Sequence, residues 1–139
     1  MEKKQVVNGT IGSDTHVIGT RMLQFALEQE GFAVTCLGAF VSQKEFIDAA
    51  LEVGAAAILV SSIYGQAEMD CQGLREKCRE AGLDHILLYL GGNVVIDYSA
   101  AAWPQVEAKF KDMGFDRVYP PGCPLARTIT DLKLDLGLA

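Results

Sequence analysis

The sequence is poor in positive charge. Its 12 Lys and Arg residues stand against 18 Asp and Glu residues, which gives a formal net charge of −6. Proteins that bind nucleic acids rely largely on Lys and Arg to neutralise phosphates, and no basic patch occurs in this sequence. The composition therefore argues against a nucleic acid as a partner.

Long hydrophobic runs are also absent. Runs such as AAAILV at 55–60 are far shorter than the roughly 20 apolar residues that cross a bilayer. The N-terminal segment MEKKQVV contains two lysines, but neither an apolar signal core nor a cleavage site follows it. We therefore expect no membrane contact and a cytoplasmic location.

Cysteine pairs of the kind that bind zinc or build a disulfide framework are missing. The four cysteines, Cys36, Cys71, Cys78 and Cys123, include no C-x-x-C pair. Cys71 and Cys78 lie seven residues apart in an expected helix, about 10 Å from one another, which is too far for a disulfide. We expect reduced thiols, and we interpret Cys36 and Cys71 as structural.

The sequence does contain a regular alternation of short apolar runs and longer amphipathic stretches. The expected strands are 5–12, 32–38, 55–62 and 85–92, and the segment 115–122 is expected to form a short strand followed by a rigid loop. The expected helices are 15–31, 42–54, 67–82, 104–114 and 125–139. Ser42 and Glu45 have the spacing of a capping box, and Gly54 is placed to end that helix. In the first helix, apolar residues recur with helical spacing at Val17, Ile18, Met22, Phe25 and Ala26.

Five strand–helix repeats predict a parallel sheet with helices on both faces. Residues 55–62 form a continuous apolar run, which is typical of a strand buried on both faces. The leading topology is a doubly wound α/β fold of the flavodoxin-like (Rossmann-like) type, with five strands in the order 2-1-3-4-5. The 139 residues suit one domain, 1–139, and are too few for two ordinary ones.

The motifs of several common α/β proteins are missing. The sequence has neither a G-x-x-x-x-G-K-S/T phosphate loop nor a G-x-G-x-x-G fingerprint. A receiver domain needs a phosphorylated aspartate at the end of its third strand, where this sequence has serines. No arrangement typical of a Ser-His-Asp or Cys-His nucleophile occurs.

In a sheet of this type, ligands bind beyond the carboxyl ends of the strands, near the switch point between the first and third strands. Polar, glycine and proline residues lie at or just after the ends of four of the expected strands: Ser13, Asp14 and His16; Ser61 and Ser62; Gly91, Gly92 and Asn93; Pro120, Pro121 and Gly122. We therefore predict the functional site at this edge of the sheet.

His16 is the most informative of these residues. By itself it could be an ordinary histidine at the start of a helix. Asp14, however, could accept a hydrogen bond from its Nδ1, which would leave Nε2 free to bind a metal. Asp14 could equally be the N-cap of the helix.

The other residues of this edge also have two interpretations. Gly91 and Gly92 are either a strand-ending turn or a place where a bulky ligand passes close to the backbone. Ser61 and Ser62 are either ordinary strand-end serines or donors to a ligand. Gly19 leaves room for a large planar group near the first helix.

Taken together, these residues resemble a known family. The pattern Asp14-x-His16-x-x-Gly19, Ser61-x-Ile63 and Gly91-Gly92 is similar to the D-x-H-x-x-G … S-x-L … G-G signature of cobalamin-binding domains of the base-off, His-on type. Isoleucine at position 63 in place of leucine is the one departure. The segments VSSIYGQAEMDCQGLREKC (60–78), GGNVV (91–95) and MGFDRVYPPG (113–122) further resemble the small (sigma) subunits of glutamate mutase.

The resemblance implies a role for each matching residue. His16 replaces the cofactor's own dimethylbenzimidazole as the lower ligand of cobalt, and Asp14 holds His16 through a hydrogen bond. The displaced nucleotide tail passes Gly19. The remaining residues expected around the cofactor are Ser13, Thr15 and Val17; Ser61, Ser62 and Ile63; Gly91, Gly92, Asn93, Val94, Val95, Ile96 and Asp97; and Pro120 and Gly122.

The resemblance also implies an activity. Adenosylcobalamin would supply the chemistry for an isomerase that interconverts L-glutamate and threo-3-methyl-L-aspartate. The catalytic residues lie on a separate large (epsilon) subunit, expected in a heterotetramer of two small and two large chains, and none is expected here. The alternatives are a non-enzymatic corrinoid carrier or cobalamin-sensing module, and a flavodoxin-like domain for another small molecule. Corrinoid methyl carriers usually have a helical domain ahead of the cobalamin domain; none is expected in this sequence, which favours the mutase.

Overall fold

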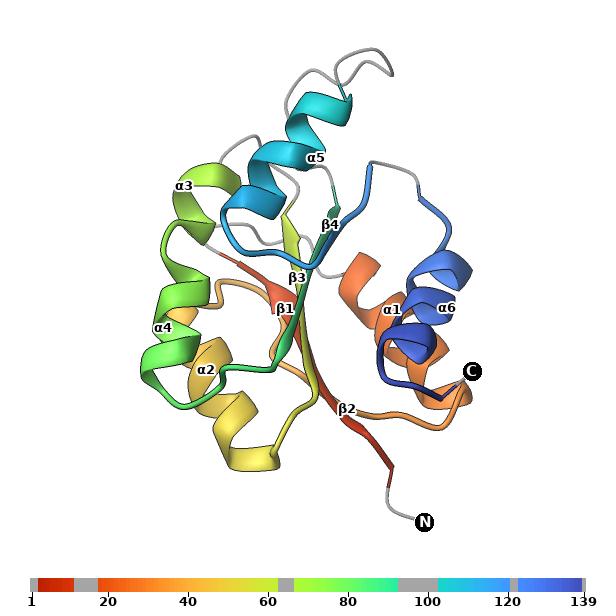
Figure 1. Ribbon diagram of the computed structural model, residues 1–139. Helices are drawn as coiled ribbons and strands as arrows, with labels where there is room; N and C mark the ends of the chain where they lie inside the picture. Colours follow the sequence, from red (N-terminus) through yellow and green to blue (C-terminus); the bar gives the residue numbers. More distant parts are fainter. Residues whose placement is uncertain (1–2, 12–17, 63–66, 93–102, 121–122, 139) are drawn as a thin grey trace.

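The computed structural model describes residues 3–11, 18–62, 67–92, 103–120 and 123–138. It contains a parallel sheet of five strands in the order β2-β1-β3-β4-β5, so the predicted flavodoxin-like fold and strand order are confirmed (Figure 1). The strands are β1 (Gln5–Thr10), β2 (Ala33–Cys36), β3 (Ala57–Ser62), β4 (Leu87–Gly92) and β5 (Arg117–Val118). The helices are α1 (Ile18–Gln29), α2 (Gln43–Val53), α3 (Ala67–Cys71), α4 (Leu74–Glu80), α5 (Trp103–Asp112) and α6 (Leu125–Asp135).

The helices divide between the two faces of the sheet. Helices α1 and α6 cover one face, and α2, α3 and α4 cover the other (Figure 1). Strand β3 contributes side chains to the hydrophobic cores on both faces of the sheet, because successive side chains of a strand point to opposite faces. Ile58 packs in the core with the α2 residue Phe46, while Leu59 packs with Leu27 of α1. This two-sided burial is the reason for the continuous apolar run in the sequence.

The helix signals at α2 are confirmed. The Ser42 hydroxyl accepts a hydrogen bond from the Glu45 amide at 3.1 Å, and the Glu45 carboxylate accepts one from the Ser42 amide at 3.2 Å. Gly54 ends the helix with a φ of 66°, a conformation that favours glycine. Gly9 of β1 allows close packing of this helix, because a Cβ there would lie 3.3 Å from the Phe46 ring.

The expected helix 67–82 is wrong as a single element. It divides into α3 and α4 at Gly73, which has a φ of 81°. The amide of Gln43 donates to the carbonyls of Asp70 and Gln72, both at 2.8 Å, and so satisfies carbonyls that the break exposes. Cys71 and Cys78 therefore lie in different helices; both are buried free thiols.

Helix α1 buries a different face from its most apolar-looking one. Met22 and Phe25 are 57% and 65% exposed, whereas Leu23 and Leu27, four residues apart, are buried. Helical spacing alone did not distinguish the two stripes. Leu23 and Leu27 are the buried stripe because they pack against residues of the β-sheet in the core.

Strand β5 is short, as expected within the segment 115–122. Only Arg117 and Val118 are strand, paired with Tyr89 and Leu90 of β4. Tyr119 still donates its amide to the Leu90 carbonyl at 2.8 Å. Pro120 has no amide hydrogen, which prevents the ladder from continuing.

Candidate functional site

The carboxyl ends of β1, β3 and β4 meet at one edge of the sheet, as predicted. Thr10 is paired with Ser61, and Ser61 with Gly91, so the predicted serine and glycine are direct neighbours across the strands. Ser62 and Gly92 form the next pair along the same two strands.

Many of the predicted site residues lie outside the described residues. They are Ser13, Asp14, Thr15, His16 and Val17; Ile63; Asn93, Val94, Val95, Ile96 and Asp97; and Gly122. The metal ligand His16 and its partner Asp14 therefore stay predictions. Gly19 lies in the first turn of α1.

A cavity of about 190 Å³ lies on the α1/α6 face, at the carboxyl ends of β3 and β4. Ser61, Gly91 and Pro120 are the predicted site residues in its described lining. The other lining residues are mostly apolar or aromatic: Leu23, Leu59, Val60, Tyr89, Leu90, Tyr119, Cys123, Leu125 and Thr128. None of the described lining residues is acidic, basic or a histidine.

Ser62 is not among the described residues of that lining. Side chains alternate along β3, so Ser61 points to the cavity face, while Ser62 lies on the face that Ile58 and Val60 share. Ser62 is buried there.

Gly91 belongs to the cavity lining. A Cβ at this position would meet only the Cβ of Tyr119, at 4.0 Å, which is ordinary contact. The backbone of Gly91 does not have the positive φ that other glycines of the chain adopt. A side chain at this position would therefore fit the backbone and project beside the cavity.

Two tyrosines form the wall of the cavity next to α6. The rings of Tyr89 and Tyr119 are 5.9 Å apart and meet edge to face at 63°. The Tyr89 hydroxyl donates to the Asp135 carboxylate, and the Tyr119 hydroxyl donates to Asp131 at 2.8 Å. Burial, reinforced by these carboxylates, raises the pKa of both tyrosines, so both hydroxyls stay protonated donors at neutral pH.

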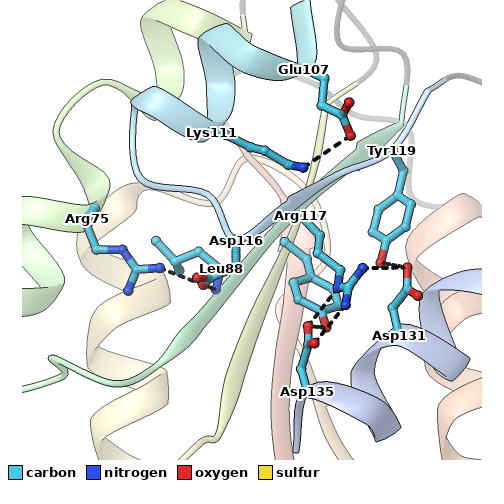
Figure 2. A network of polar contacts seen from close by, with 10 residues as sticks. Arg75, Leu88, Glu107, Lys111, Asp116, Arg117, Tyr119, Asp131 and Asp135 are labelled. Carbon is cyan, nitrogen blue, oxygen red and sulfur yellow. Dashed lines mark hydrogen bonds and ion pairs between the residues drawn. The ribbon is translucent and has the colours of Figure 1, made fainter. Parts of the chain in front are cut away.

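Arg117 joins the two carboxylates (Figure 2). Its Nε and Nη2 donate to the two oxygens of Asp135 at 2.7 and 2.8 Å, and its Nη1 lies 3.6 Å from Asp131. The guanidinium lowers the pKa of Asp135. We call these five residues, Tyr89, Arg117, Tyr119, Asp131 and Asp135, the tyrosine–arginine cluster.

Sequence reasoning missed this cluster. Residues 125–139 were expected only as a last helix. The signal that was available is the four-residue spacing of Asp131 and Asp135, which puts two carboxylates on one side of a helix. Nothing in the local sequence pairs Asp135 with Tyr89, which lies 46 residues away.

Asn8 was also missed, although it is a polar residue within an apolar strand. Its side chain is fully buried, and its Nδ2 donates to the Thr20 carbonyl at 2.9 Å. This hydrogen bond ties the first turn of α1, which contains Gly19, to the centre of the sheet. The Asn8 Oδ1 is buried without a hydrogen-bond partner among the described residues.

Of the helices that the structure describes, none has the length and apolar character that a bilayer span requires. The four cysteines are all described, and all are free.

Comparison with known proteins agrees with the geometry of this edge. The family model of the B12 binding domain matches residues 4–116. The chain is 54% identical to the glutamate mutase sigma subunit of Clostridium tetani, over 99% of both chains. It is equally similar, at 54%, to the glutamate mutase sigma subunit of Clostridium cochlearium, again over 99% of both chains.

A solved structure supports the fold. A cobalamin-binding protein from Desulfitobacterium hafniense superimposes with a TM-score of 0.76 and 20% identity, covering 96% of this chain and 60% of that one.

Proposed function

Because the chain belongs to the family of B12-binding domains and, within it, to the glutamate mutase sigma subunits, we propose that it is the cobalamin-binding subunit of a glutamate mutase, an isomerase that needs a separate catalytic subunit. The observation that carries the proposal is the cavity at the carboxyl ends of β3 and β4. It lies at the edge where an open α/β sheet binds its ligand.

The described residues fit the nucleotide tail of cobalamin. The cavity wall is apolar and aromatic, which suits a flat base, and Gly91 leaves space beside it. Ser61 is the polar group at the end of β3 that could donate to the tail. Gly19 would border the tail from α1, whose first turn Asn8 holds against the sheet.

The proposal gives His16 the role of lower cobalt ligand and Asp14 that of its hydrogen-bond partner. A carboxylate bonded to Nδ1 would fix the tautomer of His16 and increase the basicity of Nε2. When bound, adenosylcobalamin supplies the homolytic chemistry for the rearrangement of L-glutamate to threo-3-methyl-L-aspartate. The adenosyl form of the cofactor is part of the proposal.

The proposed partner is the large (epsilon) subunit, in an assembly of two small and two large chains. Both carboxylates of the amino-acid substrate need cationic partners, and the described cavity lining contains none. Substrate binding is therefore assigned to the partner. We also propose that residues 1–139 act as one cobalamin-binding domain, and that the protein is cytoplasmic, since its free thiols suit a reducing compartment.

The test combines the full chain with a large subunit, adenosylcobalamin and L-glutamate. The expected results are formation of 3-methylaspartate and a cobalamin spectrum with a histidine ligand. In the His16→Gly variant we expect both to be lost. Cobalamin binding without turnover would instead support the corrinoid carrier, and a His16→Gly variant with unchanged binding and turnover would refute the proposal.

A further inference from the structure

The tyrosine–arginine cluster connects the two sides of the cavity. Tyr89 comes from β4, Arg117 and Tyr119 come from β5 and the residue after it, and Asp131 and Asp135 come from α6. We propose that this cluster fixes α6 against the sheet and thereby sets the width of the pocket for the nucleotide tail, with Arg117, Asp131 and Asp135 as positioning residues. This inference rests on the proposed function.

Helix α6 contributes to both the cavity and the cluster. Leu125 and Thr128, in its first turns, line the cavity, and Asp131 and Asp135 follow at spacings of three and four residues. Residues with this spacing lie on one side of a helix. The anchored carboxylates therefore control the rotation and distance of the helix side that forms the cavity wall.

The cluster is stronger than an ordinary surface ion pair. The side chains of Arg117, Asp131 and Asp135 are only 33%, 18% and 21% exposed. Arg117 binds Asp135 through two parallel hydrogen bonds, an arrangement that fixes orientation as well as distance. Each carboxylate also accepts a tyrosine hydroxyl, so a shift of α6 would break several bonds at once.

The same bonds determine what the tyrosines present to the cavity. Because both hydroxyls donate to α6, the rings contribute aromatic surface to the cavity wall. Without its carboxylate, a tyrosine hydroxyl would lack its charged acceptor and the ring could turn. Loss of the cluster should therefore weaken the binding of the tail without affecting the corrin contacts made elsewhere.

Adenosylcobinamide provides the test, because it keeps the corrin and lacks the nucleotide tail. The full chain, with its large subunit, is titrated with adenosylcobalamin and with adenosylcobinamide. For Asp135→Asn we expect cobalamin binding to weaken roughly 10-fold and cobinamide binding to change less than about twofold. The same pattern, at smaller size, is expected for Tyr119→Phe, which keeps the ring and removes only the hydroxyl.

Asp116→Asn is the matched control. Asp116 is the residue before Arg117 and accepts hydrogen bonds from Arg75 and Leu88, not from residues of the cavity wall. The Asp116→Asn substitution should leave the ratio of cobalamin affinity to cobinamide affinity unchanged. The inference would be overturned if Asp135→Asn and Tyr119→Phe lost equal affinity for both corrinoids, or lost none for either. Failure of the unaltered chain to bind either corrinoid would instead overturn the proposed function itself.

Discussion

Two adjacent residues of the chain, Asp116 and Arg117, belong to two different polar networks on opposite sides of the sheet (Figure 2). Asp116 accepts hydrogen bonds from Nη2 of Arg75 at 2.7 Å and from the Leu88 amide at 2.9 Å. Arg117 binds Asp135 and Asp131 of α6 on the other side. The chemistry is the same in both networks, arginine with aspartate, but the surroundings differ.

Arg75 is bound mainly by the backbone. Its side chain is 8% exposed, and it donates to the carbonyls of Gly114 and Ile86 at 2.9 and 2.8 Å as well as to Asp116. A Cβ on Gly114 would lie 2.4 Å from the Cβ of Arg75, so the arginine and the glycine backbone fit closely. This network joins α4 to the turn before β5 and stabilises the fold.

In the tyrosine–arginine cluster, in contrast, the two carboxylates that bind Arg117 also accept hydrogen bonds from Tyr89 and Tyr119, which line a cavity. The partners of an ion pair therefore indicate its role better than the pair itself does. Backbone partners indicate a structural role, and cavity-lining partners indicate a role in binding. Four predictions test this distinction, in order of decreasing effect.

The largest effect is expected for Arg75→Ala. It would leave a carboxylate and two backbone carbonyls without their donor, and we expect the free energy of unfolding to fall by about 3 kcal/mol. The ratio of cobalamin to cobinamide affinity should not change in the folded protein. Chemical denaturation measures the first quantity. Arg79→Ala, an exposed arginine of the same helix, is the control and should change stability little.

Gly91→Leu should have the opposite effect: it should weaken cobalamin binding and leave stability nearly unchanged. The leucine side chain would occupy space beside the 190 Å³ cavity, and no left-handed conformation prevents the substitution. We expect cobalamin binding to weaken about 100-fold, or about 2.7 kcal/mol, with little change in stability. Equilibrium titration of both corrinoids is the measurement. Gly91→Ala should be intermediate, and undiminished cobalamin affinity in Gly91→Leu would contradict the assignment of the pocket.

The contribution of Asp135 to the free energy of unfolding should depend on pH in the acid range. Because Arg117 lowers the pKa of this carboxyl from the unfolded value of 3.8, the charged form favours the folded state. Its contribution is present above pH 3.8 and is lost as the pH falls through the lower folded pKa. The stability difference between the natural chain and Asp135→Asn, of up to about 1 kcal/mol for partly exposed groups, should therefore shrink below about pH 4. A difference that grew on acidification would contradict the sign.

The smallest effect is expected for Phe25→Ala on the solvent side of α1. Phe25 is 65% exposed, so the free energy of unfolding should change by less than about 0.5 kcal/mol. The matched substitution Leu23→Ala, on the cavity side of the same helix, should reduce it by about 2 kcal/mol or more. Thermal or chemical unfolding of both variants decides whether Leu23, and not Phe25, is on the buried side of α1.

Much of the fold was predictable because its signals are local. The capping box at Ser42 and the glycine at 54 are set by contacts within a few residues, and both were found. The division of the helix at Gly73 was missed, because its stabilising partner is Gln43, 27 and 29 residues away from the carbonyls that it binds. The buried stripe of α1 was missed for a related reason, since the sheet and not the helix selected it.

The candidate site divides in the same way. The meeting of Ser61 and Gly91 could be predicted from strand order alone, because parallel strands end at one edge. The tyrosine–arginine cluster could not, because its members come from β4, β5 and α6 and have no shared local pattern. His16 and Asp14 remain predictions from their spacing.

The sequence by itself therefore determined the order of strands, the edge that carries the site and the family to which the chain belongs. These depend on periodicity, glycine placement and motif spacing, all of which are written along the chain. Only the tertiary structure decided which side of α1 is buried, that Tyr89 and Tyr119 line the cavity together, and which of two neighbouring residues, Asp116 or Arg117, bonds to α6. Those outcomes depend on contacts between residues far apart in the chain, which form only when both faces of the sheet are packed.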